Sequence, residues 1–90
     1  MAQKMTLRII TPNRMVFDGQ CDEITVPGPK GEIGLLPDHA NYFSALGIGR
    51  LSFVTEGGIR NLTTVGGYVH VADNAVTILT DSADDSGEGA

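Results

Sequence analysis

Residues 68–80 read Tyr-Val-His-Val-Ala-Asp-Asn-Ala-Val-Thr-Ile-Leu-Thr, and this stretch decides the class of fold. Two alternating runs flank Asp73-Asn74, and both of these residue types tolerate the left-handed backbone conformation of a two-residue β-turn. Side chains alternate between the faces of a strand, so Tyr68 and His70 are predicted to share one face. The opposite face is apolar on both strands: Val69, Val71, Val76 and Ile78. The stretch therefore predicts a β-hairpin with one buried face.

Similar short runs recur along the rest of the chain, separated by turn residues. Residues 50–55 and 59–65 flank Glu56-Gly57-Gly58, which is typical of a short hairpin loop. The run at residues 15–17 is predicted to end at Asp18-Gly19, a dipeptide suited to positive φ. The remaining runs share the same β-branched or apolar character: residues 7–11, 23–26, 33–36 and 42–46. About eight to ten short, mostly antiparallel strands with apolar residues on both faces predict an all-β flattened sandwich or barrel.

Length and composition indicate one folded domain. Ninety residues close a single core, and an apolar share of 41% is ordinary for a globular chain. Residues 1–81 are assigned to the β-sandwich, and residues 82–90 to a flexible acidic tail without an apolar period. The net charge is −5, and four of the eleven acidic residues lie in the last ten positions. The body of the chain is therefore close to neutral.

The charge pattern and the single cysteine exclude several classes of function. Lys and Arg do not cluster with aromatic residues, so no nucleic acid is expected as a partner. Cys21 alone cannot form an intrachain disulfide, which fits a reducing compartment. No apolar run approaches the ~20 residues of a membrane-spanning helix, and residues 1–5 lack a signal peptide's apolar region. We expect a soluble, cytoplasmic chain that does not insert into a membrane directly.

No motif in the sequence predicts catalysis, a cofactor or a metal. Gly47-Ile48-Gly49 lacks the third glycine of a dinucleotide loop, and no Walker spacing is present, so no bound nucleotide is expected. Asp38-His39 resembles acid–base machinery, but adjacent side chains on an extended loop diverge. The available nucleophiles lie in no recognisable elbow: Ser44, Ser52 and Cys21. His39 and His70 do not have zinc-ligand spacing, so the residues point to a binding or structural module.

Four segments resemble the epsilon subunit of F-type ATP synthase, which is called delta in mitochondria. They are Thr11-Pro12-x-x-x-Val16-Phe17-x-Gly19, Val26-Pro27-Gly28-x-x-Gly31-Glu32-Ile33-Gly34-Leu35-Leu36-Pro37-x-His39-Ala40, Ala45-Leu46-x-x-Gly49, and Gly66-Gly67-Tyr68-Val69-x-Val71-x-x-Asn74-x-Val76-Thr77-Ile78-Leu79-Thr80-Asp81-x-Ala83. The segments follow the family order, and the second is long and unusual. Asp38 stands where family members commonly have Gly, and Asn41 stands where Pro is common.

The resemblance implies a flattened β-sandwich in the central stalk, or rotor, of a proton-translocating ATP synthase. In the family this domain packs on the gamma subunit and contacts the polar loops of the membrane-embedded c-ring. It helps to lock gamma to the ring, so that rotation reaches catalytic sites elsewhere in the complex. The chain is then expected to be non-catalytic, and peripheral on the cytoplasmic side of the bacterial plasma membrane.

The resemblance also implies two interface segments. Gly31-Glu32-Ile33-Gly34 resembles the loop that approaches the c-ring, where Glu32 would make a polar or ionic contact; the alternative is a solvated turn acid. His39, with its neighbours Asp38 and Tyr42, resembles the segment that faces gamma. The alternative for His39 is a role in bracing its own loop.

Many bacterial family members continue into a two-helix hairpin that inhibits ATP hydrolysis and in some members binds ATP. Residues 84–89 are a poor helix start, so inhibition by such a hairpin and an ATP site are not expected here, and a naturally short protein is favoured. A competing hypothesis is a stand-alone small β-barrel that binds a ligand or catalyses at Asp38-His39. That hypothesis predicts a deep pocket with His39 at its mouth. The rotor hypothesis predicts two apolar or mixed contact patches and no closed pocket.

Overall fold

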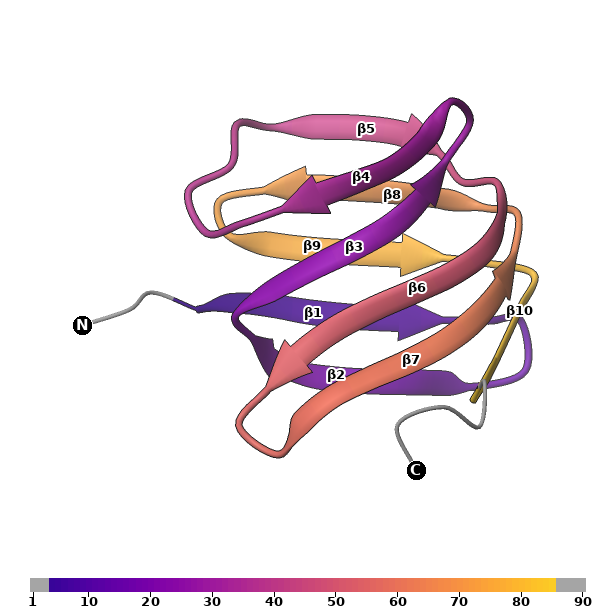
Figure 1. The fold of residues 1–90 in the computed structure, drawn as a ribbon, viewed down its shortest axis with the longest axis horizontal. Coiled ribbons are helices and arrows are strands. Elements are labelled where there is room, and N and C mark those ends of the chain that lie inside the picture. The colour runs from indigo at the N-terminus through magenta and orange to yellow at the C-terminus, as the bar shows by residue number, and fades with distance from the viewer. Residues whose placement is uncertain (1–3, 86–90) are drawn as a thin grey trace.

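A computed structural model describes residues 4–85 of the chain, and every regular element in that range is a strand. There are ten: β1 (Met5–Ile10), β2 (Met15–Cys21), β3 (Glu23–Gly28), β4 (Gly31–Leu35), β5 (Tyr42–Ala45), β6 (Ile48–Thr55), β7 (Gly58–Val65), β8 (Tyr68–Ala72), β9 (Ala75–Leu79) and β10 (Ser82–Asp85). They form two five-stranded sheets, which face each other as a sandwich (Figure 1). The predicted all-β, mostly antiparallel fold is confirmed.

The two sheets have the strand orders β2-β1-β9-β8-β5 and β10-β7-β6-β3-β4, here called the first and the second sheet. Neighbouring strands are antiparallel, except that β1 and β9 run parallel. The chain passes between the sheets several times, for example from β4 at the edge of the second sheet to β5 at the edge of the first. These two edge strands lie on the same side of the sandwich (Figure 1).

The β8–β9 hairpin forms as the sequence predicts. Asp73 and Asn74 have φ values of 51° and 61°, so both occupy the left-handed region that a two-residue turn with a right-handed twist requires. Val71 pairs with Val76, and the four apolar residues of the inward face are at most 1% exposed. Tyr68 and His70 lie on the exposed face, as predicted.

Inward side chains from both sheets form one continuous core. Fully buried members come from both layers: Met5, Leu7, Ile9, Val69, Val71 and Ile78 from the first sheet, and Ile24, Val26, Leu35, Leu51, Phe53 and Leu62 from the second. The rings of Phe17 and Phe53 bridge the two layers with centroids 4.7 Å apart. Burial of such side chains stabilises the fold by about 1.5–3 kcal/mol each.

Three local predictions are wrong. Strand β2 continues through Asp18-Gly19, because Gly19 pairs with Leu7 and leaves room for the Phe17 ring, whose Cζ would lie 3.0 Å from an added Cβ. The predicted loop at residues 31–34 belongs to strand β4, and the chain turns at Pro29-Lys30 instead.

The predicted tail is the third correction. Residues 82–85 form β10, which pairs with β7 and buries Ala83 to 4% exposure. Strand β10 is held on the edge of β7 by main-chain hydrogen bonds, which do not require alternating apolar side chains. The acidic composition of residues 82–85 therefore did not reveal a strand. The rest of the predicted tail, residues 86–90, lies outside the described residues.

Gly67 occupies a position that no other residue fits. Its φ is 108°, and an added Cβ would overlap the Leu79 carbonyl oxygen and approach the Thr80 Cα to 2.7 Å. Both obstacles are backbone atoms, so they cannot rotate away. The start of β8 is thereby held against the end of β9 by a contact that depends on the absence of a side chain.

We predict that Gly67→Ala lowers the free energy of unfolding by more than about 2 kcal/mol, because both the backbone conformation and the space oppose a methyl group. Gly34→Ala is the matched control, since its Cβ would meet nothing within 4 Å. It should change stability by less than about 0.5 kcal/mol. Urea denaturation of both variants checks this, and equal midpoints for the two would contradict it.

Candidate functional site

The outward face of the first sheet carries an apolar row that crosses all five strands. The strand register aligns Ala45 with Tyr68, Tyr68 with Leu79, Leu79 with Ile10, and Ile10 with Met15. Tyr68, Leu79 and Met15 are each about half exposed, at 51%, 49% and 48%. A row of this length on the solvent face is unusual, because an isolated antiparallel sheet normally alternates apolar inside with polar outside.

An aromatic cluster extends this row. Phe43, 65% exposed, stacks on Tyr68 with ring centroids 5.4 Å apart and an interplanar angle of 15°. His70 meets the edge of Phe43 at 6.2 Å, and Thr77 and Leu79 complete the lining of a shallow, mainly apolar hollow. We call the apolar row together with Phe43 and His70 the outer-face patch. Contiguous exposed apolar surface of this kind marks a contact site for another macromolecule.

The loop between β4 and β5 carries Asp38 and His39. Asp38 has a φ of 66°, and its main-chain N–H donates to Asn74 Oδ1 at 2.6 Å. Asn74 Nδ2 donates back to Asp38 Oδ1 at 3.2 Å. The His39 N–H donates to the Leu36 carbonyl at 3.1 Å, which closes a turn. The loop is therefore attached to the β8–β9 turn of the first sheet.

The His39 ring has two fixed neighbours. Its Nδ1 lies 2.7 Å from the Ala40 carbonyl oxygen, and its ring meets Tyr42 edge-on at 5.7 Å. A carbonyl oxygen can accept but not donate, so Nδ1 carries the hydrogen, and in the neutral ring Nε2 remains an acceptor. The ring is half-buried, and the bond from Nδ1 braces its own loop. Tyr42 is half-buried and faces the core, whereas Asp38 is exposed.

The other predicted segment lies on the second sheet. Gly31 pairs with Gly28 and Glu32 with Pro27, and both Gly31 and Glu32 are exposed beside the Pro29-Lys30 turn. Ile33 is half-buried and packs against the core, so little of its side chain is open to a partner. Strand β4 separates this hairpin tip from the His39 loop at its other end (Figure 1). The structure therefore does not bring the two predicted segments together.

The competing catalytic hypothesis finds no support in the geometry at His39. The hollow there is open and polar, and it is lined by Asp38, His39, Asn41, Asp73 and Asn74. The candidate nucleophiles are engaged elsewhere: Ser44 with the Ala45 carbonyl, Ser52 with Asn61, and Cys21 in the core. Within residues 4–85 there is no group of three or more His, Cys, Asp or Glu side chains placed to hold a metal ion.

Residues 4–86 match the family model described as the ATP synthase delta/epsilon chain, beta-sandwich domain. The match covers nearly the whole chain. This chain belongs to that family.

Curated relatives agree with the family. The chain is 40% identical over 84 residues to an ATP synthase epsilon chain of Desulfitobacterium hafniense, covering 93% of this chain and 64% of that one. It is 39% identical over 80 residues to the epsilon chain of Leptospira borgpetersenii, with 89% and 63% covered. The chain therefore spans less than two thirds of the length of these relatives. Epsilon chains are non-catalytic subunits, in agreement with the expectation that this chain is not an enzyme by itself.

Two solved complexes contain similar folds. A chain of the Euglena gracilis mitochondrial ATP synthase, in a structure of OSCP, F1 and the c-ring, superposes with a TM-score of 0.87 at 27% identity, covering 94% of this chain and 55% of that one. A chain of the Tetrahymena thermophila central stalk and c-ring superposes with a TM-score of 0.78 at 20% identity, with 96% and 69% covered, which shows the fold alone. The predicted resemblance to the epsilon family is confirmed.

Sequence reasoning missed the outer-face patch of this epsilon-family chain. Its signal was present, because Phe43, Tyr68 and Leu79 stand at positions that alternate with buried or half-buried residues. Their alignment into one row, however, depends on the register of non-consecutive strands.

No helix in residues 4–85 is long and apolar enough to span a membrane.

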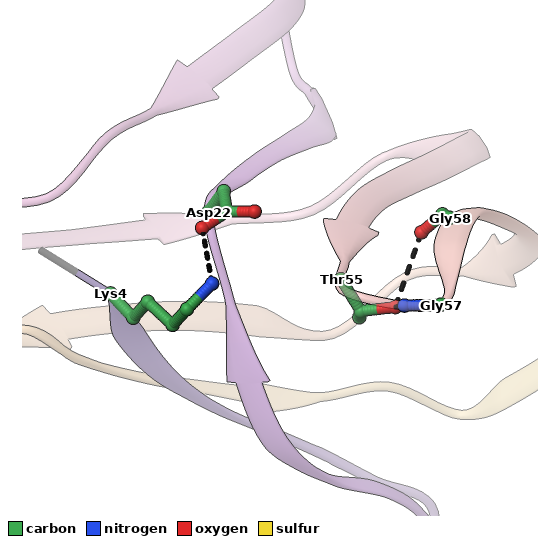
Figure 2. A network of polar contacts seen from close by, with 5 residues as sticks. All are labelled: Lys4, Asp22, Thr55, Gly57 and Gly58. Carbon is green, nitrogen blue, oxygen red and sulfur yellow. Dashed lines mark hydrogen bonds and ion pairs between the residues drawn. The ribbon is translucent and has the colours of Figure 1, made fainter. Parts of the chain in front are cut away.

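Cys21 lies in the core of the same domain, beside an ion pair. Asp22 Oδ1 accepts from Lys4 Nζ at 2.7 Å, close to the β6–β7 turn that Thr55 and Gly57 stabilise (Figure 2). Burial raises the pKa of the Cys21 thiol from its ordinary 9.0 to about 11; the Asp22 carboxylate adds to this shift and Lys4 opposes it. Because the folded thiol keeps its proton to higher pH than the unfolded one, folding stability falls as pH rises through this range.

We predict that stability declines between pH 9 and pH 11, and that Cys21→Ala reduces this decline. The whole thiol contribution is at most about 2.7 kcal/mol, because one pKa unit corresponds to about 1.4 kcal/mol. Denaturant titrations at pH 8, 9, 10 and 11 measure it. The same steepness of decline in the Cys21→Ala variant would contradict the prediction.

Proposed function

We propose that the chain is the β-sandwich part of a central-stalk subunit that couples the gamma subunit to the c-ring in an F-type ATP synthase. The outer-face patch carries the proposal, because it is a large apolar surface on a domain whose family assembles into a multisubunit complex. The similar chain in the Euglena assembly supports it, since that structure includes a c-ring. As a synthase subunit, the chain is a peripheral part of a membrane-bound complex, which we assign to the cytoplasmic side of a bacterial plasma membrane.

The gamma subunit is the proposed partner of the outer-face patch and of the adjoining His39 loop. Phe43, Tyr68 and Leu79 offer broad apolar area, and the His39 loop leads directly into strand β5, which carries Phe43. Aromatic residues at the centre of such a surface and polar groups at its rim are the usual anatomy of a protein–protein interface. Apolar area should dominate the affinity, because exposed polar pairs contribute little.

The c-ring is the proposed partner of the β3–β4 hairpin. Gly31, Glu32 and Gly34 present an exposed strand edge, and Glu32 is an exposed carboxylate next to the turn. Its small neighbours keep approach to the carboxylate open, since a Cβ at Gly31 or Gly34 would meet nothing within 4 Å. A basic residue in a polar loop of the ring would complement Glu32. The tip of the β3–β4 hairpin and the His39 loop lie at opposite ends of β4. One domain can therefore contact two partners at the same time.

Leu79→Asp tests the gamma interface, with Ile59→Asp as the matched control. Both residues are exposed and apolar, at 49% and 64%, but Ile59 lies on the second sheet. Leu79→Asp should weaken binding of purified gamma by about tenfold or more, and Ile59→Asp should leave it unchanged. Isothermal titration calorimetry measures both. If the unchanged chain fails to bind folded gamma, the proposed function is wrong; if both variants bind equally, the assigned surface is wrong.

Glu32→Lys tests the ring contact, with Glu23→Lys as the control. Both are exposed acids on the second sheet, and the two charge changes are equal. Because an exposed ion pair contributes roughly 0.2–1 kcal/mol, Glu32→Lys should reduce capture of the gamma–epsilon pair by detergent-solubilised c-ring by about two- to fivefold. The effect should shrink at high salt. An equal loss in the two variants would remove Glu32 from the interface.

A further inference from the structure

The loop between β4 and β5 connects two different sheets, and a pair of side-chain hydrogen bonds holds it in place. Strand β4 is the edge of the second sheet and β5 is the edge of the first, so residues 36–41 cross the open side of the sandwich without ladder pairing. Asp38 and Asn74, 36 residues apart in sequence, exchange the two bonds of 2.6 and 3.2 Å. This reciprocal pair ties the crossing loop to the β8–β9 turn.

Both members of the pair have the backbone conformation that the bonds require. Asp38 and Asn74 have φ values of 66° and 61°, in a region where Asp and Asn are tolerated better than other side chains. A Gly at position 38 would keep the main-chain N–H for Asn74 but lose the second bond. The Asp38 carboxylate therefore adds an acceptor without giving up the left-handed conformation.

His39 follows directly in the chain, so its placement depends on this pair. The His39 N–H is bonded to Leu36, and its ring is set by the Ala40 carbonyl and by Tyr42. The bonds to Leu36 and Ala40 are local to the loop, whereas Tyr42 is the first residue of β5. The side-chain hydrogen bonds that attach the middle of the loop to the first sheet come from Asn74 at its half-buried turn position.

We propose that Asn74 is a positioning residue that pre-organises the Asp38–His39 loop for recognition of the gamma subunit. The inference rests on the proposed function, since it assigns Asn74 a role in that same contact. Ordering a loop before binding removes an entropic cost from the association. The Asp38–Asn74 pair therefore raises the affinity for gamma without contacting it. Asp38 acts with Asn74, and His39 is the group that they present.

Asn74→Gly removes the side chain while keeping a residue that favours positive φ, so the turn itself is preserved. Asp73→Gly is the matched control, because Asp73 has a φ of 51° in the same two-residue turn. Asp38→Gly keeps the Asn74 Oδ1 bond to the main chain and loses the return bond. The double variant Asp38→Asn with Asn74→Asp exchanges donor and acceptor, and it should restore a reciprocal pair.

Each variant of the 90-residue chain is studied by amide hydrogen exchange in the free state and by calorimetric titration with gamma. Asn74→Gly should speed exchange of the Asp38 and His39 amides while that of Val71 and Ile78 stays unchanged, and should weaken gamma binding by about fivefold. Asp38→Gly should have a smaller effect, Asp73→Gly none, and the exchanged double variant should recover most of the loss.

Two results would overturn the inference. If Asn74→Gly speeds exchange in the loop but binds gamma as tightly as the unchanged chain, the Asp38–Asn74 pair orders the loop and this order does not contribute to gamma binding. If Asn74→Gly weakens binding with unaltered exchange at Asp38, Asn74 acts by another route. In both cases the unchanged chain still binds gamma, which separates these failures from a failure of the proposed function.

Discussion

Packing of the two inward faces against each other is the constraint on which the rest of the molecule depends. Backbone ladders hold strands together within a sheet, but the two sheets meet through side chains, with Phe17 and Phe53 in contact across the gap. The buried hydroxyls of Thr64 and Thr80 reach main-chain carbonyls, and among residues 4–85 no buried side-chain polar atom lacks a partner. Cohesion between the sheets is therefore almost entirely apolar, and it uses up one face of every strand.

The core takes its apolar residues from the inward faces of the strands, so the apolar residues of the outer-face patch need a separate explanation. A domain of this size gains only a modest excess of burial over chain entropy, and half-exposed apolar residues add little to the stability of the isolated chain. Phe43, Tyr68 and Leu79 could each be polar without loss to the core, because each points away from it. The proposed partner, by covering them, would account for their presence. The sheet supplies the flatness and the fixed spacing that such a contact needs.

Alternation and turn chemistry were sufficient to predict the class of fold, the β8–β9 hairpin and its buried valines, because these depend on residues near each other in the chain. The predicted end of the strand at Asp18-Gly19 was wrong, because Gly19 makes room for the Phe17 ring and does not form a turn. Strand β10 was missed because an added edge strand is held by main-chain bonds that composition does not report. The Asp38–Asn74 pair was also beyond reach, because it joins two loops that come together when the sheets pack.

The two open sides of the sandwich are closed by different means, and the difference bears on function. On the side of β2 and β7, the Arg60 guanidinium lies 5.8 and 5.5 Å from the ring centroids of Phe17 and Phe53 and pairs with Asp85 of β10 at 3.6 Å. The Arg60 guanidinium and the two aromatic rings cover the core on this side, for which no partner is proposed. On the side of β4 and β5, the crossing loop does the covering, and that loop also carries His39. The proposed recognition loop is thus part of the closure of the fold, so its position follows the relative placement of the two sheets. A contact built in this way transmits force into the whole sandwich instead of into a loose segment, as a coupling element between two moving partners requires.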